Sequence, residues 1–312
     1  MQRLNRWPDG LNGLPSESSP QTMRRECLPR QPEIDAAGSE HPTFGCRGLL
    51  HDLYARLLRK CRDEDRRPEM SRDREWFAAL GREALAALRQ DIPPPSDEVF
   101  EREVQGIVSD LELFLTEESG GDGSRTPVAL EVSFGRGSSG EEPLDRAEPV
   151  VIDLGNGLRF RLAGRIDRID RLASGEFEIV DYKTGGFFRD DWQGVFAGGT
   201  RLQHALYGIA AVELLRAKYG RPTIAGGVYY FPSAKGRQEK VPIPEPTKSA
   251  TTAVLRDLRR VIASGVFIHA SEESACKFCD FGAACGTDPR DRANEKQDDP
   301  LLAPYRNLVA HD

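Results

Sequence analysis

The chain has 312 residues, of which 38% are hydrophobic and 30% charged, and its net charge is −7. A chain of this length can bury roughly 70 to 75% of its unfolded surface, which favours one sizeable domain over a small disulfide scaffold. No stretch approaches the roughly 20 apolar residues needed to span a bilayer, so we expect no membrane partner. Phosphate binding favours basic surfaces, so contact with nucleic acid would depend on local basic groups.

In chain order, residues 1–42 are rich in Pro, Ser, Arg and Gln without periodicity and predict a poorly ordered N-terminal arm. One α/β domain is expected over residues 43–290, and a C-terminal tail over 291–312. The hydrophobic spacing predicts, in order, helices over 48–61, 72–90 and 96–117, strands near 127–134, 149–153, 158–170 and 176–183, a helix over 200–218, a strand over 224–231 and a helix over 247–264.

The turn signal Ser174-Gly175 separates two predicted strands that should pair as an antiparallel hairpin. Asp167 on the first strand and Asp181 on the second would then converge, and the period-2 rule sets Lys183 on the same face as Asp181. Two carboxylates, with the backbone carbonyl of Tyr182, are a donor set that suits Mg²⁺. Lys183 would orient an attacking water and offset charge on a phosphodiester transition state. The alternative is an exposed ladder of charged side chains.

Four segments occur in the order found in the PD-(D/E)XK nuclease superfamily, and the chain resembles the RecB and AddB type of nuclease domain in particular. The matching segments are Phe44 to His51, which resembles a G-x-x-x-H helix start with its glycine one residue closer, Gly164-Arg165-Ile166-Asp167 (G-x-x-D), Asp181-Tyr182-Lys183 (D-x-K) and Gln203 to Tyr207 (Q-x-x-x-Y). The resemblance implies a restriction-endonuclease-like αβββαβ core, with a mixed central sheet flanked by helices and a C-terminal Cys-rich segment that binds a cluster.

The same resemblance implies roles for individual residues. Asp167 and Asp181 would hold Mg²⁺ or Mn²⁺, Lys183 would be the catalytic lysine, and His51 would be an additional metal ligand. Gln203 and Tyr207, one helical turn apart, would support the site or contact the DNA backbone.

Alternatives stay open at several of these positions. His51 also fits a half-buried position on an amphipathic helix. Glu131 lies where such domains often carry a strand glutamate, and an edge-strand charge explains it equally well. A group of arginines around the predicted hairpin offers either a basic patch for DNA or an ordinary solvated face; its members are Arg159, Arg161, Arg165, Arg168 and Arg171.

Three of the six cysteines, Cys276, Cys279 and Cys285, have the spacing C-x-x-C-x5-C, which leaves one vacancy in a tetrahedral site of four thiolates. AddB-like domains close this arrangement with an N-terminal cysteine around a 4Fe-4S cluster, and the resemblance places Cys27 there, with Cys46 as the alternative. Zn²⁺ or unpaired reduced thiols are the competing interpretations. Cys61 fits a buried thiol. A long chain with no signal-peptide pattern predicts a reducing, cytoplasmic location.

These features favour a metal-dependent DNA nuclease of recombination or repair that acts on single strands or DNA ends, with RNA as a further candidate substrate. The alternative function is a catalytically idle DNA-binding or scaffolding subunit of a helicase-nuclease complex. The sequence contains no G-x-x-x-x-G-K-[ST] run, so a helicase motor would be a separate chain.

Overall fold

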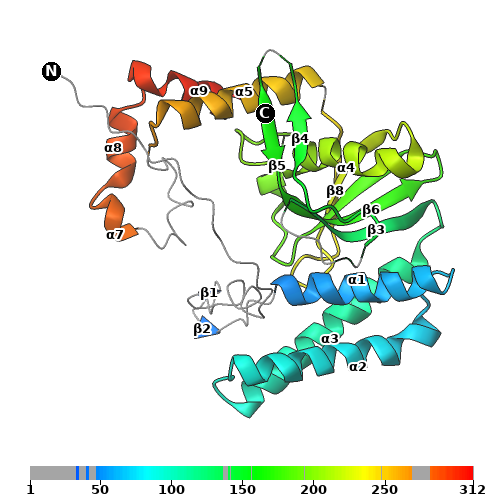
Figure 1. The fold of residues 1–312 in the computed structure, drawn as a ribbon. Coiled ribbons are helices and arrows are strands. Elements are labelled where there is room, and N and C mark those ends of the chain that lie inside the picture. The colour runs from blue at the N-terminus through cyan, green and yellow to red at the C-terminus, as the bar shows by residue number, and fades with distance from the viewer. Residues whose placement is uncertain are drawn as a thin grey trace, which may run out of the picture. The chain divides into compact units, whose positions relative to one another are not determined.

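A computed structural model of the chain describes residues 33–34, 40–41, 47–135, 140, 142–155, 157–192, 194–246, 248–268 and 282–311. The chain divides into two compact units, Met1–Gly48 and Leu49–Asp312. The first contains a two-stranded antiparallel pair, β1 (Glu33–Ile34) and β2 (Glu40–His41). The second contains the central sheet and the candidate site (Figure 1).

The second unit contains the remaining elements in the following order. They are α1 (Arg47–Asp63, which begins in the first unit), α2 (Met70–Asp91), α3 (Asp97–Gly120), β3 (Arg125–Phe134), β4 (Val150–Asp153), β5 (Arg159–Leu162), β6 (Gly164–Leu172), β7 (Phe177–Tyr182), the 3-10 helix η2 (Arg189–Trp192), α4 (Gln203–Tyr219), β8 (Ile224–Tyr230), β9 (Lys240–Pro244), α5 (Lys248–Ser264), α7 (Gly282–Cys285), α8 (Pro289–Glu295), the 3-10 helix η3 (Pro300–Leu302) and α9 (Ala303–Val309).

Five strands form the central sheet in the order β3-β6-β7-β8-β9. β3, β6 and β7 are antiparallel neighbours, and α4 then connects β7 to β8, which pairs with it in parallel. A parallel pair requires such a crossover, whereas β9 can return antiparallel beside β8 through a short loop. This arrangement confirms the predicted mixed sheet and its αβββαβ order. The predicted Cys-rich segment lies largely within 269–281, outside the described residues.

Helices cover both faces of the sheet, which is consistent with strands that are apolar on each side (Figure 1). On one face α1 and α3 pack against β7 and β8, and the buried side chains there include Leu53, Leu57, Phe114, Tyr182 and Tyr230. On the other face α4 packs against β7 and β8, and α5 belongs to the same hydrophobic core, whose buried side chains include Ile166, Ile169, Ile179, Leu215 and Val254. The end of β7 is therefore held between two apolar layers.

The single strand predicted over 158–170 is wrong, because the structure divides it at Ala163. β5 pairs with β4 in a separate hairpin, while β6 begins at Gly164 and enters the central sheet. A Cβ atom on Gly164 would lie 3.1 Å from the Tyr207 hydroxyl and 3.3 Å from the Phe134 ring. Glycine therefore allows the chain to pass close under α4 at the start of β6.

The first three helices follow their predicted positions within a few residues at each end. Ser96 caps α3, since its side chain accepts a hydrogen bond from the Val99 N–H at 3.3 Å. The last residues are also helical, and Leu308 of α9 is buried in the same core as α5. His311 lies 3.0 Å from Asp257 of α5. No helix among the described residues is long and apolar enough to cross a membrane.

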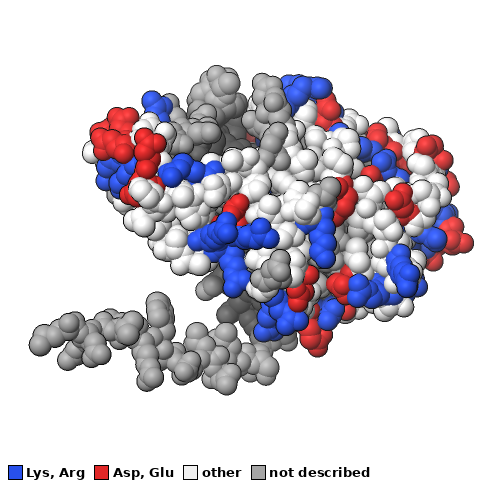
Figure 2. Space-filling model, turned by 90° about the horizontal axis from the view of Figure 1, so that it is seen from above, with Lys and Arg blue, Asp and Glu red and all other residues white. Residues whose placement is uncertain are grey.

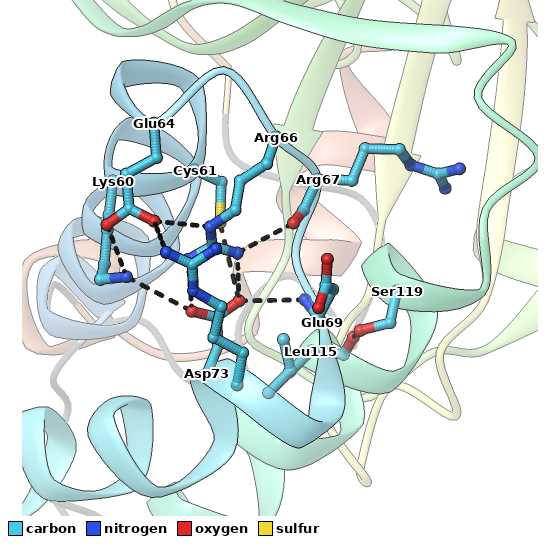
Figure 3. A network of polar contacts seen from close by, with 10 residues as sticks. Lys60, Cys61, Glu64, Arg66, Arg67, Glu69, Asp73, Leu115 and Ser119 are labelled. Atoms are coloured by element: carbon cyan, nitrogen blue, oxygen red, sulfur yellow. Dashed lines mark hydrogen bonds and ion pairs between the residues drawn. The ribbon is translucent and has the colours of Figure 1, made fainter.

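A buried ion pair joins the end of α1 to the start of α2 (Figure 3). The guanidinium of Arg66 donates two hydrogen bonds to Asp73, at 2.6 and 2.7 Å, and the Asp73 side chain is fully buried. The same carboxylate accepts the Glu69 N–H at 3.0 Å and lies 3.5 Å from Lys60 Nζ. Asp73 therefore fixes the turn that sets the angle between the two helices.

Replacing Asp73 by asparagine should lower the free energy of unfolding by about 2 kcal/mol, because it breaks charged hydrogen bonds and leaves Arg66 poorly paired. Urea unfolding at neutral pH measures this. Asp63→Asn is the matched control, since Asp63 is 70% exposed and its contact with Arg62 is 3.4 Å. The control should change stability by less than about 0.5 kcal/mol.

The Asp73 contribution should also depend on pH. Burial opposes ionisation, but the hydrogen bonds from Arg66 and Glu69 outweigh it and lower the pKa of Asp73 from 3.8 to about 2. A depressed carboxyl pKa stabilises the fold fully above its unfolded value and loses that effect as the pH falls toward its folded value. The stability gap between wild type and Asp73→Asn should therefore shrink between about pH 3.8 and about pH 2. A gap that stays constant over this interval would contradict the assignment.

Candidate metal and phosphodiester site

The candidate site forms where β6 and β7 stop pairing. Their regular register ends at Arg168 opposite Val180, so Asp167 and Asp181 come next on the two strands. The Lys183 N–H donates to the Tyr230 carbonyl on β8 at 2.7 Å. Backbone groups alternate in direction along a strand, so the N–H and carbonyl of Tyr182 face β6. There the Tyr182 N–H donates to the Asp167 carboxylate at 2.9 Å.

Three side chains from three elements surround this point. His51 of α1, Glu131 of β3 and Asp167 of β6 each offer one ligand atom, and these atoms lie within 4.8 Å of one another. His51 Nδ1 lies 3.4 Å from Asp167 Oδ2, and the His51 ring meets the Tyr182 ring edge-on at 5.7 Å. One imidazole and two carboxylates are a donor set that suits a divalent cation such as Mg²⁺ or Mn²⁺.

Glu131 is held in an unfavourable backbone conformation. Its φ is +51°, in the left-handed region that costs an L-residue roughly 1 to 2 kcal/mol. One carboxylate oxygen pairs with Arg165 at 2.9 Å, while the other is buried with no hydrogen-bond partner among the described residues. Burial and the nearby charge of Asp167 raise the pKa of Glu131 to about 7. Strain and an unsatisfied buried oxygen at one residue are typical of a binding site.

Asp181 and Lys183 lie on the α4 side of β7, as the alternation predicted, while Val180 and Tyr182 are buried on the other face. Lys183 Nζ lies 2.5 Å from Asp181 and donates to Gln203 Oε1 at 3.3 Å. Burial, together with the charge of Asp167, raises the pKa of Asp181 to about 6. Asp181 is paired with Lys183 and is not one of the three closest ligand residues.

Two aromatic residues complete this side of the site. Lys183 Nζ lies over the Tyr229 ring, 5.1 Å from its centre, and this cation–π contact helps to fix the position of the ammonium. Tyr207 of α4 bonds to the Gln203 side chain and to the Arg165 backbone, and its ring meets Phe134 edge-on at 6.2 Å. Gln203 and Tyr207 therefore connect Lys183 on β7 to the start of β6.

His51 is protonated more readily than an ordinary histidine. Burial opposes the charged form, but the hydrogen bond to Asp167 and the charges of Asp167, Glu131 and Asp181 outweigh it, so the pKa of His51 is raised above 6.5. The site thus combines three carboxylates with one imidazole, one ammonium and the Arg165 guanidinium that pairs with Glu131. Carboxylates crowded in a buried place repel one another, and a bound cation relieves that repulsion.

The sequence analysis placed His51, Asp167, Asp181, Lys183, Gln203 and Tyr207 in one site, and the structure brings them together. Glu131, for which two interpretations were open, lies inside it. The sequence did not predict Tyr229 as a site residue, because an aromatic residue in an apolar strand does not indicate that a lysine from another strand lies over its ring. The view of Arg168 as part of an exposed basic group is wrong, since its side chain is 6% exposed and pairs with Asp170 at 2.6 Å and Glu118 at 2.7 Å.

Of the predicted cluster cysteines, Cys27, Cys276 and Cys279, and the alternative Cys46, lie outside the described residues. Cys285 ends α7 as a partly buried free thiol. Cys61 is a buried free thiol, and burial together with the charge of Asp73 raises its pKa to about 11. A thiol that resists ionisation is a poor metal ligand, which agrees with its interpretation as a core residue.

The exposed charges are mixed rather than uniformly basic. On the face that Figure 2 shows, Lys and Arg side chains form small groups separated by Asp and Glu. Several arginines of the second unit are paired at short range, including Arg159 with Asp153 and Arg125 with Glu178. A polyanionic ligand would therefore depend on a few local cations rather than on a uniformly basic surface.

Comparison with known proteins gives a consistent result. Three relatives are named as subunits of an ATP-dependent helicase/deoxyribonuclease. The one from Acetivibrio thermocellus is 39% identical over 34% of this chain and 9% of its own length. Those from Bacillus mycoides and Geobacillus kaustophilus are each 30% identical over 59% of this chain and 16% of their own length. The chain thus spans less than one fifth of these relatives.

The family model of the PD-(D/E)XK nuclease superfamily matches residues 24–286, which include the whole central sheet and all the site residues described above. This confirms the resemblance drawn from the four sequence segments. The chain belongs to the PD-(D/E)XK nuclease superfamily.

Proposed function

We propose that the protein is a divalent-metal-dependent deoxyribonuclease of DNA recombination or repair that hydrolyses phosphodiester bonds in single strands or at DNA ends. The observation that carries this proposal is the close group of His51, Glu131 and Asp167 beside Lys183, which is itself held by Asp181 and Gln203. The relatives' name, helicase/deoxyribonuclease, supports DNA as the substrate.

His51, Glu131 and Asp167 would hold the cation, with Asp181 and the Tyr182 carbonyl as the adjoining oxygen donors. A bound divalent cation supplies Lewis-acid polarisation of the phosphate and a lower pKa for water. Lys183 contributes a fixed positive charge where negative charge develops on the phosphate oxygens, and it positions the attacking water. Gln203 and the Tyr229 ring hold the Lys183 ammonium in place, so little reorganisation is needed during the reaction.

An idle scaffolding subunit is the alternative function, and two features of the site argue against it. Glu131 retains a strained φ and a buried unsatisfied oxygen, both of which cost stability. Lys183 is held by a carboxylate, an amide and an aromatic ring. A site without a ligand gains nothing from either arrangement, whereas a nuclease site needs both.

The relatives' name also supports a partner. We propose that a helicase partner delivers DNA to this domain, because the relatives are named as subunits of an ATP-dependent helicase/deoxyribonuclease. We place this activity in the reducing cytoplasm, where the buried Cys61 thiol stays reduced.

Cleavage of labelled single-stranded DNA should require Mg²⁺ or Mn²⁺. Asp181→Asn and Lys183→Gln should each lower the rate about 100-fold or more. The first removes the carboxylate that holds Lys183 and adjoins the cation, and the second removes the positive charge beside the reacting phosphate. Asp153→Asn, a change at an exposed ion pair in the β4–β5 hairpin, is the matched control and should leave the rate unchanged. Blunt duplex and RNA run in parallel define the substrate. Equal degradation by all variants would assign the activity to a contaminant or another site.

Metal binding can be tested without turnover. Because Glu131 has a pKa of about 7 instead of 4.5, its ionisation destabilises the metal-free fold as the pH rises from about 4.5 to about 7. Glu131→Gln should therefore raise the melting temperature in EDTA above about pH 7, with no gain below about pH 4.5. It should also shrink the stabilisation by Mn²⁺, which for an intact site reaches about 2.7 kcal/mol at a hundredfold excess over the dissociation constant.

The control for this measurement is Glu112→Gln, which removes an exposed ion pair with Arg74. It should leave both the melting temperature in EDTA and the shift caused by Mn²⁺ close to wild type. A Glu131→Gln protein that Mn²⁺ stabilises as fully as wild type would remove Glu131 from the ligand set.

We further propose a structural 4Fe-4S cluster held by Cys276, Cys279 and Cys285, with Cys27 or Cys46 as the fourth ligand. The cysteine spacing and the superfamily membership support it. Anaerobically purified protein should be brown, and Cys279→Ser should remove the colour and reduce solubility. Cys61→Ser is the control and should stay brown. Colourless protein with stoichiometric zinc would replace the iron assignment and leave the nuclease proposal standing.

A further inference from the structure

The loop after β7 carries an exposed aromatic side chain close to the candidate site. Phe188 follows Lys183 by five residues and is 67% exposed, the most exposed large apolar side chain of the described residues after Phe267. Exposing a phenylalanine loses the free energy that its burial would provide. A single exposed ring is not unusual by itself, so its surroundings decide what it can do.

The loop that holds Phe188 is anchored on both sides of it. Phe187 is buried against Phe231, with ring centres 5.2 Å apart, and Trp192 of η2 packs on Tyr229 at 4.8 Å. Tyr229 is the ring that lies beneath Lys183 Nζ. The chain is thus fastened to Phe231 on one side of Phe188 and, on the other, to Tyr229, the residue that positions the proposed catalytic lysine.

A second fixed loop adjoins the first at Gly186. A Cβ atom there would lie 3.4 Å from the Phe188 ring and 3.9 Å from the carbonyl oxygen of Lys235, in the loop between β8 and β9. That loop is held to α3, because the Ala234 N–H donates to Asp110 at 2.8 Å. Lys235 and Arg237 are both exposed. One ring and two cations therefore occupy adjoining, well-anchored loops beside the end of β7.

We propose that Phe188, Lys235 and Arg237 form a binding surface for single-stranded DNA, in which an unpaired base stacks on the Phe188 ring and the two cations contact the backbone phosphates. An aromatic ring beside positive charges is the combination that binds single strands with little regard to sequence. Bases inside a duplex are already stacked on both sides, so the ring selects unpaired nucleotides. This surface rests on the proposed function, since it supplies the strand to the same site.

The first test measures binding of fluorescein-labelled oligothymidylate to the full chain in EDTA, where cleavage does not interfere. Phe188→Ala should weaken binding about 10-fold, the loss expected for one base–aromatic stack. Phe188→Leu should weaken it similarly, whereas Phe188→Trp should bind as wild type, because stacking needs a ring and not merely an apolar side chain. Phe267→Ala, at the most exposed aromatic elsewhere, is the matched control and should bind normally.

A second substrate isolates the base. On an oligonucleotide of the same length built from abasic nucleotides, wild type and Phe188→Ala should bind equally, because no base remains to stack. Replacing Lys235 and Arg237 by glutamine should lower the slope of log affinity against log salt by about 0.7 for each phosphate that the protein no longer neutralises. In the presence of Mg²⁺, Phe188→Ala should raise KM for single strands about 10-fold and leave kcat unchanged.

Failure of this inference is distinguishable from failure of the proposed function. A wild type that cleaves DNA while Phe188→Ala binds oligothymidylate equally well would overturn the stacking surface alone. Phe188-dependent binding by a wild type that never cleaves would support the surface and overturn the nuclease. Equal losses by Phe188→Ala on the thymidylate and abasic strands would overturn base stacking. Because Phe188 is exposed, its variants should melt as wild type does, which excludes misfolding as the cause.

Discussion

The site depends on one hydrogen bond, from the Tyr182 N–H to the Asp167 carboxylate. In a continued ladder this N–H would donate to a carbonyl of β6, and Asp167 would project from the sheet like any strand residue. Because the strands part after Arg168 and Val180, the carboxylate takes the place of that carbonyl. The bond fixes the Asp167 side chain between the strands and keeps the Tyr182 carbonyl directed to the same point. Displacing it would separate the Asp167 carboxylate on β6 from Lys183 on β7.

The buried side chains on the α1 and α3 face of the sheet explain why β6 and β7 stay apart beyond Arg168 and Val180. Tyr182 is buried among aromatic rings of α1 and α3, with Tyr54 at 5.2 Å and Phe114 at 5.8 Å. Arg168 lies in the same layer and pairs with Asp170 and Glu118 while donating to the Tyr182 hydroxyl at 3.4 Å. A buried arginine with satisfied hydrogen bonds is costly to move, since any shift leaves a charge unpaired. The polar network on one face therefore fixes the backbone that presents the carboxylates on the other.

Sequence reasoning found the part of this site that follows from strand periodicity. The spacing of Asp167, Asp181 and Lys183 around a Ser-Gly turn requires only local pairing, and the structure contains that hairpin. Hydrophobic periodicity did not predict the features of the site that depend on contacts between segments distant in sequence. Nothing local indicates that residues 158–170 divide at Ala163, because the close approach of Tyr207 to Gly164 comes from α4. The position of Glu131 beside His51 and the position of Tyr229 under Lys183 likewise depend on how separate elements pack.

The charges of the site and the stability of the fold oppose each other. Asp167, Asp181 and Glu131 are gathered where burial already disfavours ionised carboxyls, and this raises the pKa of Glu131 and Asp181 to about 7 and about 6. His51, Lys183 and Arg165 offset part of the repulsion, but burial still opposes ionisation of the carboxyls, and the strained φ of Glu131 adds a further cost. The burial of apolar side chains on both faces of the sheet has to offset this cost in the free energy of folding. A site kept at a cost to the stability of the fold agrees with the proposed binding of a cation, whose charge would relieve the repulsion between the carboxylates.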